Sequence, residues 1–328
     1  MTQVGERNLI TDVPGIRVGT AEDAGLRSGV TVVLPDGPAV AAVDARGGGG
    51  GSREIELLDP AATVEACHAI VLSGGSAYGL DAAGGVMAWL GDQGRGFAIG
   101  DAIVPIVPSA ILFDLLNGGN KDWGRTPPYR DLGFAAVAAA ATDFALGNAG
   151  AGLGATAGLL KGGLGSASVV HEDGYTVGAL AAVNSHGSVL MPGSATFWAW
   201  ALERDGEFGD RDPPTERPSD HDWDFQAPAG ASTTLAIAAT DVTLSKAQAK
   251  RVAIMAQDGL ARAIRPVHTP LDGDIVFVLS TGVRPLGEPL VDIPRIGMLA
   301  ADCVARAIAR GVYEAESLGD HPGYRDLY

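Results

Sequence analysis

The sequence predicts an α+β protein in which strands and helices form separate layers. Short strand-like runs follow one another and are joined by Gly, Pro or Asp turns, which is typical of antiparallel hairpins. Helical patterns come before and after these runs without steady strand–helix alternation, so a doubly wound parallel sheet is disfavoured. The 328 residues contain no internal repeat and no clean linker, and we therefore expect one domain spanning 1–328.

Composition narrows the function classes. A net charge of −16 argues against nucleic acid or an anionic membrane as a partner. No run reaches the roughly 18 uninterrupted apolar residues of a membrane span, and the N-terminus lacks the basic-then-apolar pattern of a signal peptide. Cys67 and Cys303 fit no metal or redox spacing, and the histidines and carboxylates form no recognised metal motif. We expect a soluble cytoplasmic protein with no metal and no organic cofactor.

The N-terminal part is predicted to contain short antiparallel strands at 16–18, 29–34 and 40–43. A loop with five consecutive glycines follows, between Arg46 and Glu54. It lacks the G-x-x-x-x-G-K-[ST] order of a phosphate-binding loop, so a nucleotide site is disfavoured.

The central part is predicted to contain two helices and a hairpin. Ser76 is placed to cap a helix that runs to Gly91, and the Ala-rich stretch 131–146 is a second helical pattern. Strands at 167–170 and 175–183 are joined by a Glu-Asp-Gly turn, and the second strand ends at Asn184.

The C-terminal part begins with a stretch dense in charge and Pro, 203–222, which we expect to be mobile because it offers little apolar surface to bury. An apolar strand starts at Thr233. Ser245 caps a helix with a single apolar face, a strand covers 275–279, and an amphipathic helix covers 297–313.

Thr233 is the candidate nucleophile. It lies where small, turn-prone residues meet a rigid strand, directly after the expected mobile stretch. A hydroxyl in that place can attack the carbonyl of the preceding Ser232 and cut the chain. The freed α-amine, whose ordinary pKa is roughly 7.7–8.0, then serves as general base for the hydroxyl. The plainer alternative is a loop that enters a core strand with two incidental threonines.

Four more residues complete the hypothesis. Asn184, at a strand end, offers an amide donor to an oxyanion. Lys161, in a Gly-rich turn, could bond the threonine hydroxyl or tune the amine by charge. Asp272 and Asp274 precede a strand and could hold the α-amine. Turn chemistry or solvation explains each of them equally well when taken singly.

The run Gly-Ala-Ser-Thr-Thr-Leu-Ala-Ile-Ala-Ala-Thr-Asp ending at Asp241 resembles the N-terminal-nucleophile family of β-aminopeptidases, L-aminopeptidase/D-esterases and nylon-oligomer hydrolases. The Gly-rich loop after Arg46 and the Lys-Gly-Gly-Leu-Gly run at Lys161 also match that family. The resemblance implies a four-layer αββα sandwich, cleavage into fragments 1–232 and 233–328, and a homotetramer of processed protomers. It also implies that the Gly-rich loop is a close-packed turn beside the site.

The resemblance assigns catalytic roles to Thr233, Lys161, Asn184, Asp272 and Asp274. The Asp-x-Asp pair is typical of the nylon-hydrolase branch, where the β-aminopeptidase branch tends to have Ser and Glu. Two departures stand out: Ser232 replaces the Asn that often precedes the cut, and Phe113 stands where members often carry an oxyanion-supporting Tyr near the substrate.

The expected function is hydrolysis of amide bonds in linear amino-acid oligomers, such as 6-aminohexanoate oligomers, or in small peptides, through an acyl-threonine intermediate. Two alternatives remain open at this point. One is an aminopeptidase that releases N-terminal β-amino or small amino acids. The other is an unprocessed binding protein that kept the fold and lost self-cleavage.

Overall fold

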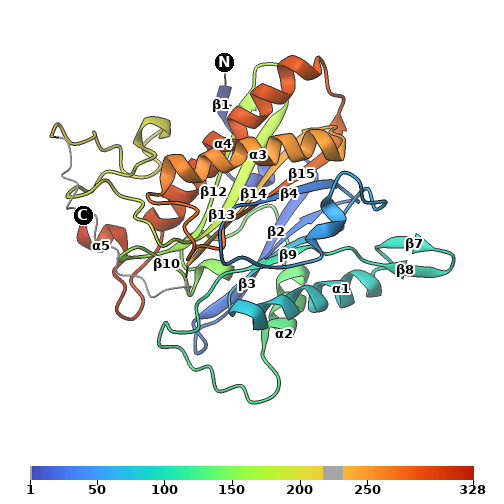
Figure 1. Cartoon of the computed structure of the whole chain (residues 1–328), viewed down its shortest axis with the longest axis horizontal. Coiled ribbons are helices and arrows are strands. Elements are labelled where there is room, and N and C mark those ends of the chain that lie inside the picture. Colours follow the sequence, from blue (N-terminus) through green and yellow to red (C-terminus); the bar gives the residue numbers. More distant parts are fainter. Residues whose placement is uncertain (1, 217–231) are drawn as a thin grey trace.

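Two β-sheets stack face to face between two layers of helices (Figure 1). The computed structural model describes residues 2–216 and 232–328. Helices α3 (Lys246–Ala263) and α4 (Pro289–Tyr313) cover one sheet, and α1 (Ala82–Asp92) and α2 (Tyr129–Ala138) cover the other. The predicted α+β class and the αββα sandwich are therefore confirmed.

The first sheet has six strands and carries the candidate nucleophile on an interior strand. Their order is β1 (Thr2–Val4), β12 (Gly163–His171), β13 (Thr176–Asn184), β14 (Thr233–Val242), β15 (Ile275–Arg284) and β4 (Val40–Ala45). Strands β14 and β15 are parallel and the other neighbours are antiparallel. Because a parallel pair needs a crossover, α3 connects β14 to β15 over the outer face.

The second sheet has five strands, in the order β2 (Ile16–Asp23), β3 (Ser28–Pro35), β6 (Ile70–Ser73), β9 (Ser109–Ile111) and β5 (Gly51–Arg53). Two small hairpins lie outside both sheets: β7 (Phe97–Ile99) with β8 (Ala102–Val104), and β10 (Thr156–Ala157) with β11 (Leu160–Lys161). The remaining helices are η1 (Ile10–Asp12), η2 (Ile55–Leu58), η3 (Ser76–Asp81), η4 (Gly150–Gly152), η5 (Trp200–Leu202) and α5 (Tyr324–Leu327).

Three apolar cores separate the four layers. Alternation along β14 explains two of them: Leu235 and Ile237 face the opposite sheet, whereas Ala236 and Ala238 face α3 and α4. The third core lies between the second sheet and α1/α2. The small side chains of β14 allow the helices to approach closely, and the strand is buried over its whole length.

Several predicted elements differ from the structure in their ends. Ser245 caps α3 as expected, since its hydroxyl accepts the backbone N–H of Gln248. The predicted cap at Ser76 is wrong, because Ser76 has φ +51° inside η3 and α1 begins six residues later. The Ala-rich helix ends at Ala138 and not at 146. Helix α4 begins at Pro289, eight residues before the predicted start at 297, and continues through Pro294.

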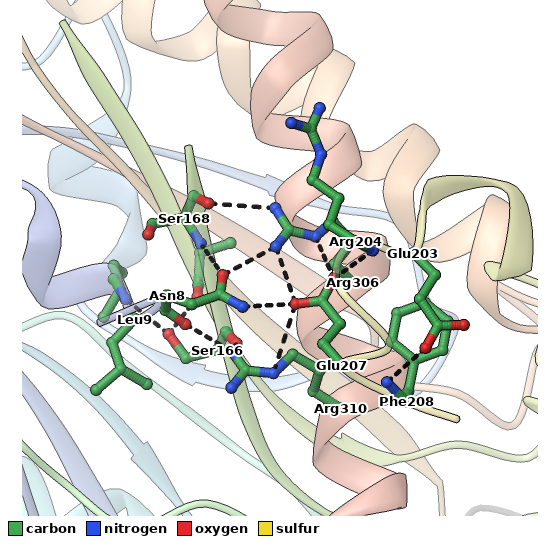
Figure 2. A network of polar contacts seen from close by, with 12 residues as sticks. Asn8, Leu9, Ser166, Ser168, Glu203, Arg204, Glu207, Phe208, Arg306 and Arg310 are labelled. Carbon is green, nitrogen blue, oxygen red and sulfur yellow. Dashed lines mark hydrogen bonds and ion pairs between the residues drawn. The ribbon is translucent and has the colours of Figure 1, made fainter. Parts of the chain in front are cut away.

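The expectation that 203–222 is mobile is wrong for the part that the structure describes. Phe208 is buried, the Glu207 side chain is 6% exposed, and Figure 2 shows Glu207 beside two arginines of α4. Arg306 Nε donates to Glu207 Oε1 at 2.5 Å and Arg306 Nη2 donates to Oε2 at 2.9 Å. Asn8 donates to the same carboxylate at 2.6 Å. The charged segment can pack here because a carboxylate tolerates burial when counter-charges and hydrogen-bond donors surround it. Residues 217–222 lie outside the described part.

No helix within 2–216 or 232–328 is both long and apolar enough to cross a membrane.

Candidate active site

The candidate residues gather at one end of the six-stranded sheet. Asn184 is the last residue of β13 and lies directly opposite Thr233, the first residue of β14. On the other side, Ser232 forms a parallel bridge with Asp272, just before β15. The sheet register itself therefore brings together three strand ends that are far apart in the sequence.

The Thr233 hydroxyl lies against the bond that it is expected to cut. Oγ1 is 2.6 Å from the carbonyl oxygen of Ser232 and donates to it. The backbone N–H of Gly273 donates to the same oxygen at 3.0 Å. A Cβ on Gly273 would come within 2.5 Å of Thr233 Oγ1, so the close approach requires glycine. The Gly273 N–H is thus a donor placed where negative charge would develop on this oxygen during attack by the Thr233 hydroxyl.

Asp272 and Asp274 are buried on either side of Gly273 and are held by hydrogen bonds. Asp274 Oδ1 accepts the backbone N–H of Thr234 at 2.9 Å, and its Oδ2 lies 2.8 Å from His268 Nδ1. Asp272 Oδ2 accepts the backbone N–H and the hydroxyl of Thr269, and its Oδ1 accepts the N–H of His186. The two carboxylates therefore fix the turn that carries the Gly273 N–H.

Asn184 has its side chain oriented by both neighbours of the strand end. Its Oδ1 accepts the backbone N–H of Thr156 at 2.9 Å, and its Nδ2 donates to the carbonyl of Phe113 at 3.1 Å. Phe113, two residues after β9 of the opposite sheet, therefore contacts Asn184 through its backbone carbonyl.

Lys161 is the last residue of β11 and lies two residues before β12 of the six-stranded sheet. Gly163 pairs with Val183, so the residues just before β12 lie beside Asn184. The Lys161 ammonium is buried and donates to the carbonyls of Gly152 and Gly162 at 2.8 and 2.6 Å. Burial lowers its pKa to about 7, although the charge of Asp114 acts in the opposite direction. Its two bonds go to backbone carbonyls and not to the threonine hydroxyl that the sequence hypothesis named.

The Gly-rich loop packs directly on the Asp272–Asp274 turn. Gly49 N–H donates to the carbonyl of Asp272 at 2.8 Å, and Gly47 N–H donates to that of Asp274 at 3.3 Å. A Cβ on Gly47 would lie 2.3 Å from the backbone nitrogen of Asp274. The interpretation of this loop as a close-packed turn beside the site agrees with the structure.

Sequence reasoning missed three groups. The Gly273 N–H carries no side-chain signal, and His268 belongs to no motif that marks it as a partner of Asp274. Asp114, next to Phe113, is buried; it accepts from the Ser28 hydroxyl at 2.5 Å and from Gly75 N–H at 2.8 Å. Burial raises its pKa. An acidic residue inside the apolar run 109–116 was the available signal for Asp114.

The fold and the family together define an amide-bond hydrolase with the N-terminal-nucleophile fold. The chain aligns with a Burkholderia sp. β-aminopeptidase at a TM-score of 0.73, with 24% identity over 97% of this chain and 90% of that one. It aligns at 0.70 with the L-aminopeptidase D-Ala-esterase/amidase of Ochrobactrum anthropi, described as a variant of the Ntn-hydrolase fold, with 23% identity over 96% and 88%. The chain belongs to peptidase family S58, whose model matches residues 8–325.

The relatives found by sequence include proteins named as aminopeptidases and proteins named as 6-aminohexanoate-oligomer hydrolases. An uncharacterized aminopeptidase of Mycobacterium tuberculosis is 47% identical over 98% of both chains, and one of Mycobacterium leprae is 43% identical over 98% of this chain and 94% of that one. A 6-aminohexanoate-oligomer endohydrolase of Kocuria sp. is 29% identical over 84% of this chain and 76% of that one. The nylon-hydrolase resemblance is confirmed, and the aminopeptidase relatives are more similar.

Proposed function

We propose that the chain is a self-processing amidohydrolase that uses Thr233 as an N-terminal nucleophile after cutting the Ser232–Thr233 bond. The observation that carries the proposal is the position of Thr233 Oγ1, 2.6 Å from the Ser232 carbonyl oxygen, which also accepts the Gly273 N–H. A nucleophile beside its target and an oxyanion donor already in place are what acyl transfer requires.

Self-cleavage proceeds as an acyl shift followed by hydrolysis. Thr233 Oγ attacks the Ser232 carbonyl carbon, and the Gly273 N–H stabilises the resulting oxyanion. The C–N bond breaks and the proton released by Oγ passes to the nitrogen, which becomes the α-amine of Thr233, while Ser232 is left as an ester on Oγ. Water then cleaves the ester, which gives fragments 1–232 and 233–328.

Turnover repeats this chemistry on a substrate amide. The α-amine accepts the Oγ proton as Oγ attacks the substrate carbonyl, and water later hydrolyses the acyl-threonine. Asn184 Nδ2 supplies an oxyanion donor, and the Asp272/Asp274 pair holds the amine in place. Lys161, whose pKa is about 7, adjusts the charge at the amine by proximity. Phe113 shapes the entrance from the opposite sheet.

Intact mass and denaturing electrophoresis of the purified protein test the proposal. We expect two stoichiometric fragments whose junction lies between Ser232 and Thr233. Thr233→Ala should give one full-length band, because it lacks the attacking oxygen. Thr233→Ser keeps that oxygen and should still be cut.

Thr234→Val is the matched control, since Thr234 is the adjacent buried threonine on the opposite face of β14. We expect it to be cut at the same bond. A full-length wild-type band, with the same mass as Thr233→Ala, would contradict self-processing and favour the unprocessed binding protein.

For the substrate, we propose linear oligomers of ω- or β-amino acids or small peptides. A cavity of about 430 Å³ begins at His186, two residues beyond the end of β13, and Thr233 does not line it; its walls include Leu160, Leu190 and Met191 with Arg265. His186, whose backbone holds Asp272, also lines it. Apolar walls with a cation fit a methylene chain that carries a carboxylate.

An aminopeptidase is the second candidate, favoured by the 47% identity to a relative with that name. Assays on β-alanyl anilide and on 6-aminohexanoate oligomers separate the two. Release of aniline without oligomer cleavage supports the aminopeptidase, and the reverse supports the oligomer hydrolase. We further propose that the processed protomers form a cytoplasmic homotetramer, which size-exclusion chromatography and cell fractionation test.

A further inference from the structure

His268 stands in a left-handed backbone conformation, φ +55°, in the loop between α3 and β15. That conformation is uncommon for a residue other than glycine, and it persists where the surrounding structure holds it. The His268 side chain is 18% exposed. Its ring nitrogen Nε2 is buried and has no hydrogen-bond partner among the described residues. The self-cleavage and turnover steps proposed for Thr233 give this residue no task.

Two donors of His268 converge on one oxygen of Asp274. The His268 backbone N–H donates to Asp274 Oδ2 at 3.0 Å, and ring Nδ1 lies 2.8 Å from the same atom. Two acceptors at that distance need a proton between them, so Nδ1 is the donor. Nε2 then carries no proton, which suits a buried nitrogen for which the described residues offer no acceptor, because a buried N–H without an acceptor is costly.

The other oxygen of Asp274 is thereby left for β14. Asp274 Oδ1 accepts the backbone N–H of Thr234 at 2.9 Å, and Thr233 is the residue before it. A carboxylate oxygen has two lone pairs, so the two donors of His268 fill those of Oδ2, whereas Oδ1 can still accept one more hydrogen. A cut before Thr233 would replace one amide N–H by an amine with additional hydrogens. Oδ1 is therefore placed to accept one of them.

We propose that His268 is a positioning residue: by holding Asp274 Oδ2 it directs Oδ1 to the α-amine that serves as the general base at Thr233. The inference rests on the proposed function, because that amine exists only after self-cleavage.

The Gly273 turn has supports of its own. Asp272 is held by the backbone N–H and hydroxyl of Thr269 and by the N–H of His186, and the Gly-rich loop donates to the turn as well. Loss of the His268 ring should therefore affect turnover by the processed protein more than self-cleavage.

Substitutions at His268 separate the ring donor from the backbone. His268→Asn can adopt the left-handed conformation and place its amide donor near the position of Nδ1. His268→Asp has the same shape without that donor, and His268→Gly keeps only the backbone. His171→Ala is the matched control, because it removes another His–Asp pair, with His171 Nδ1 3.2 Å from Asp173 Oδ2, at the opposite end of the six-stranded sheet.

Steady-state kinetics of the processed proteins measures the effect on turnover, with whichever of β-alanyl anilide and 6-aminohexanoate oligomers the wild type hydrolyses. We expect kcat of His268→Gly and His268→Asp to fall about 10²-fold, the usual effect of misplacing a catalytic group by about 1 Å, with little change in KM. His268→Asn should recover most of the loss, and His171→Ala should keep the wild-type kcat. Equal kcat values for the Asn and Asp variants, or failure of both His268→Gly and His268→Asp to self-cleave, would overturn the proposal.

The amide proton resonance of Thr234 tests the orientation of Asp274 without catalysis. In a Thr233→Ala background the attacking hydroxyl is absent and the Thr234 N–H remains. There, His268→Gly and His268→Asp should move this resonance upfield, because the hydrogen bond to Asp274 Oδ1 weakens, and His268→Asn should not. An unmoved resonance, with a wild type that is cleaved and active, would refute the positioning role alone. A wild type that is neither cleaved nor active would refute the proposed function and this role with it.

Discussion

At the scale of single residues, the site depends on a backbone N–H as much as on side chains. Gly273 donates to the Ser232 carbonyl while leaving room for the Thr233 hydroxyl. Two buried carboxylates, each with several donors, flank it and hold it there. The turn is thus organised around one donor that cannot be removed by changing a side chain.

Gly273→Ala should slow self-cleavage strongly. Its Cβ would lie 2.5 Å from Thr233 Oγ1, so either the hydroxyl or the turn must move away from the Ser232 carbonyl. Loss of one oxyanion donor typically costs about 10²–10³ in rate, and we expect an effect of that order. The fraction of cleaved protein against time after synthesis measures it.

Gly50→Ala is the matched control for that variant. It changes a glycine of the adjacent loop, where a Cβ would have ordinary contacts of 3.5 Å or more. Cleavage of Gly50→Ala at the wild-type rate is expected. Equal slowing of both variants would mean that general loop packing, and not the Gly273 donor, sets the rate.

Lys161 should make stability depend on pH above neutrality. Its folded-state pKa is about 7, against an ordinary value of 10.5, so between these values the unfolded chain binds a proton that the folded chain lacks. The free energy of unfolding therefore rises with pH through this window, and the unfavourable contribution is fully present below pH 7. Urea unfolding at pH 7.0 and 8.5 should show a rise for the wild type.

Lys161→Met keeps the length of the chain and removes the charge, so the rise should shrink. The difference between wild type and variant isolates Lys161, because the other groups titrate in both proteins. Identical pH dependence of the two proteins would show that Lys161 is not neutral in the folded state near pH 8.

The residues of the candidate site could be predicted from their types and their places at strand ends. That they lie together depends on the order and register of the strands, which residue types do not reveal. Asn184, Thr233 and the Asp272/Asp274 pair each stand at a strand end, where polar groups can face a shared edge. Their meeting required the order β13-β14-β15, which hydrophobic alternation does not specify. Phe113 was placed near the substrate because it stands where the family often has Tyr, and in the structure its backbone carbonyl contacts Asn184.

At the scale of elements, the segment 203–216 shows where composition misleads. Charge and Pro predict an unpacked stretch, yet Glu207 is buried against Arg306 and Arg310. Its neutralising partners lie about a hundred residues away on α4, so no local pattern could reveal them. The predicted end of α2 and the predicted start of α4 were wrong for a similar reason, because tertiary packing outweighs local helix propensity at both places.

Glu207→Gln should destabilise the protein by about 3–5 kcal/mol, the usual cost of leaving one partner of a buried ion pair uncompensated. Arg306 is almost fully buried, so water cannot replace the lost carboxylate. Equilibrium urea unfolding measures the change. The segment with Glu207 precedes the proposed cut and α4 follows it, so this pair joins the two fragments.

Glu314→Gln is the control, because Glu314 pairs with Arg325 at 3.4 Å on the surface. Exposed pairs contribute about 0–1 kcal/mol, and we expect a loss within that range. If Glu207→Gln lowers the free energy of unfolding no more than Glu314→Gln does, the buried ion pair stabilises the protein no more than a surface pair.

At the scale of the whole molecule, the two expected fragments are interleaved. Fragment 233–328 supplies β14, β15, α3 and α4, whereas fragment 1–232 supplies the strands on both sides of the β14–β15 pair. The apolar core beneath α3 and α4 is shared between them.

The fragments should therefore stay together after cleavage. We expect both to elute as one species in native size exclusion and to separate only in denaturant. Denaturing electrophoresis across the native peak checks this, with Thr233→Ala as the uncleaved reference for elution volume. Fragments that part in native buffer would contradict the shared sheet.

The interior position of β14 has one more consequence. A cut at the end of a sheet's outermost strand would leave unsatisfied backbone groups open to pairing with other molecules, which is a common route to aggregation. The terminus that the proposed cut would create belongs to a strand whose two edges are filled by β13 and β15. The proposed cleavage would therefore release a chain end without exposing an unpaired strand edge.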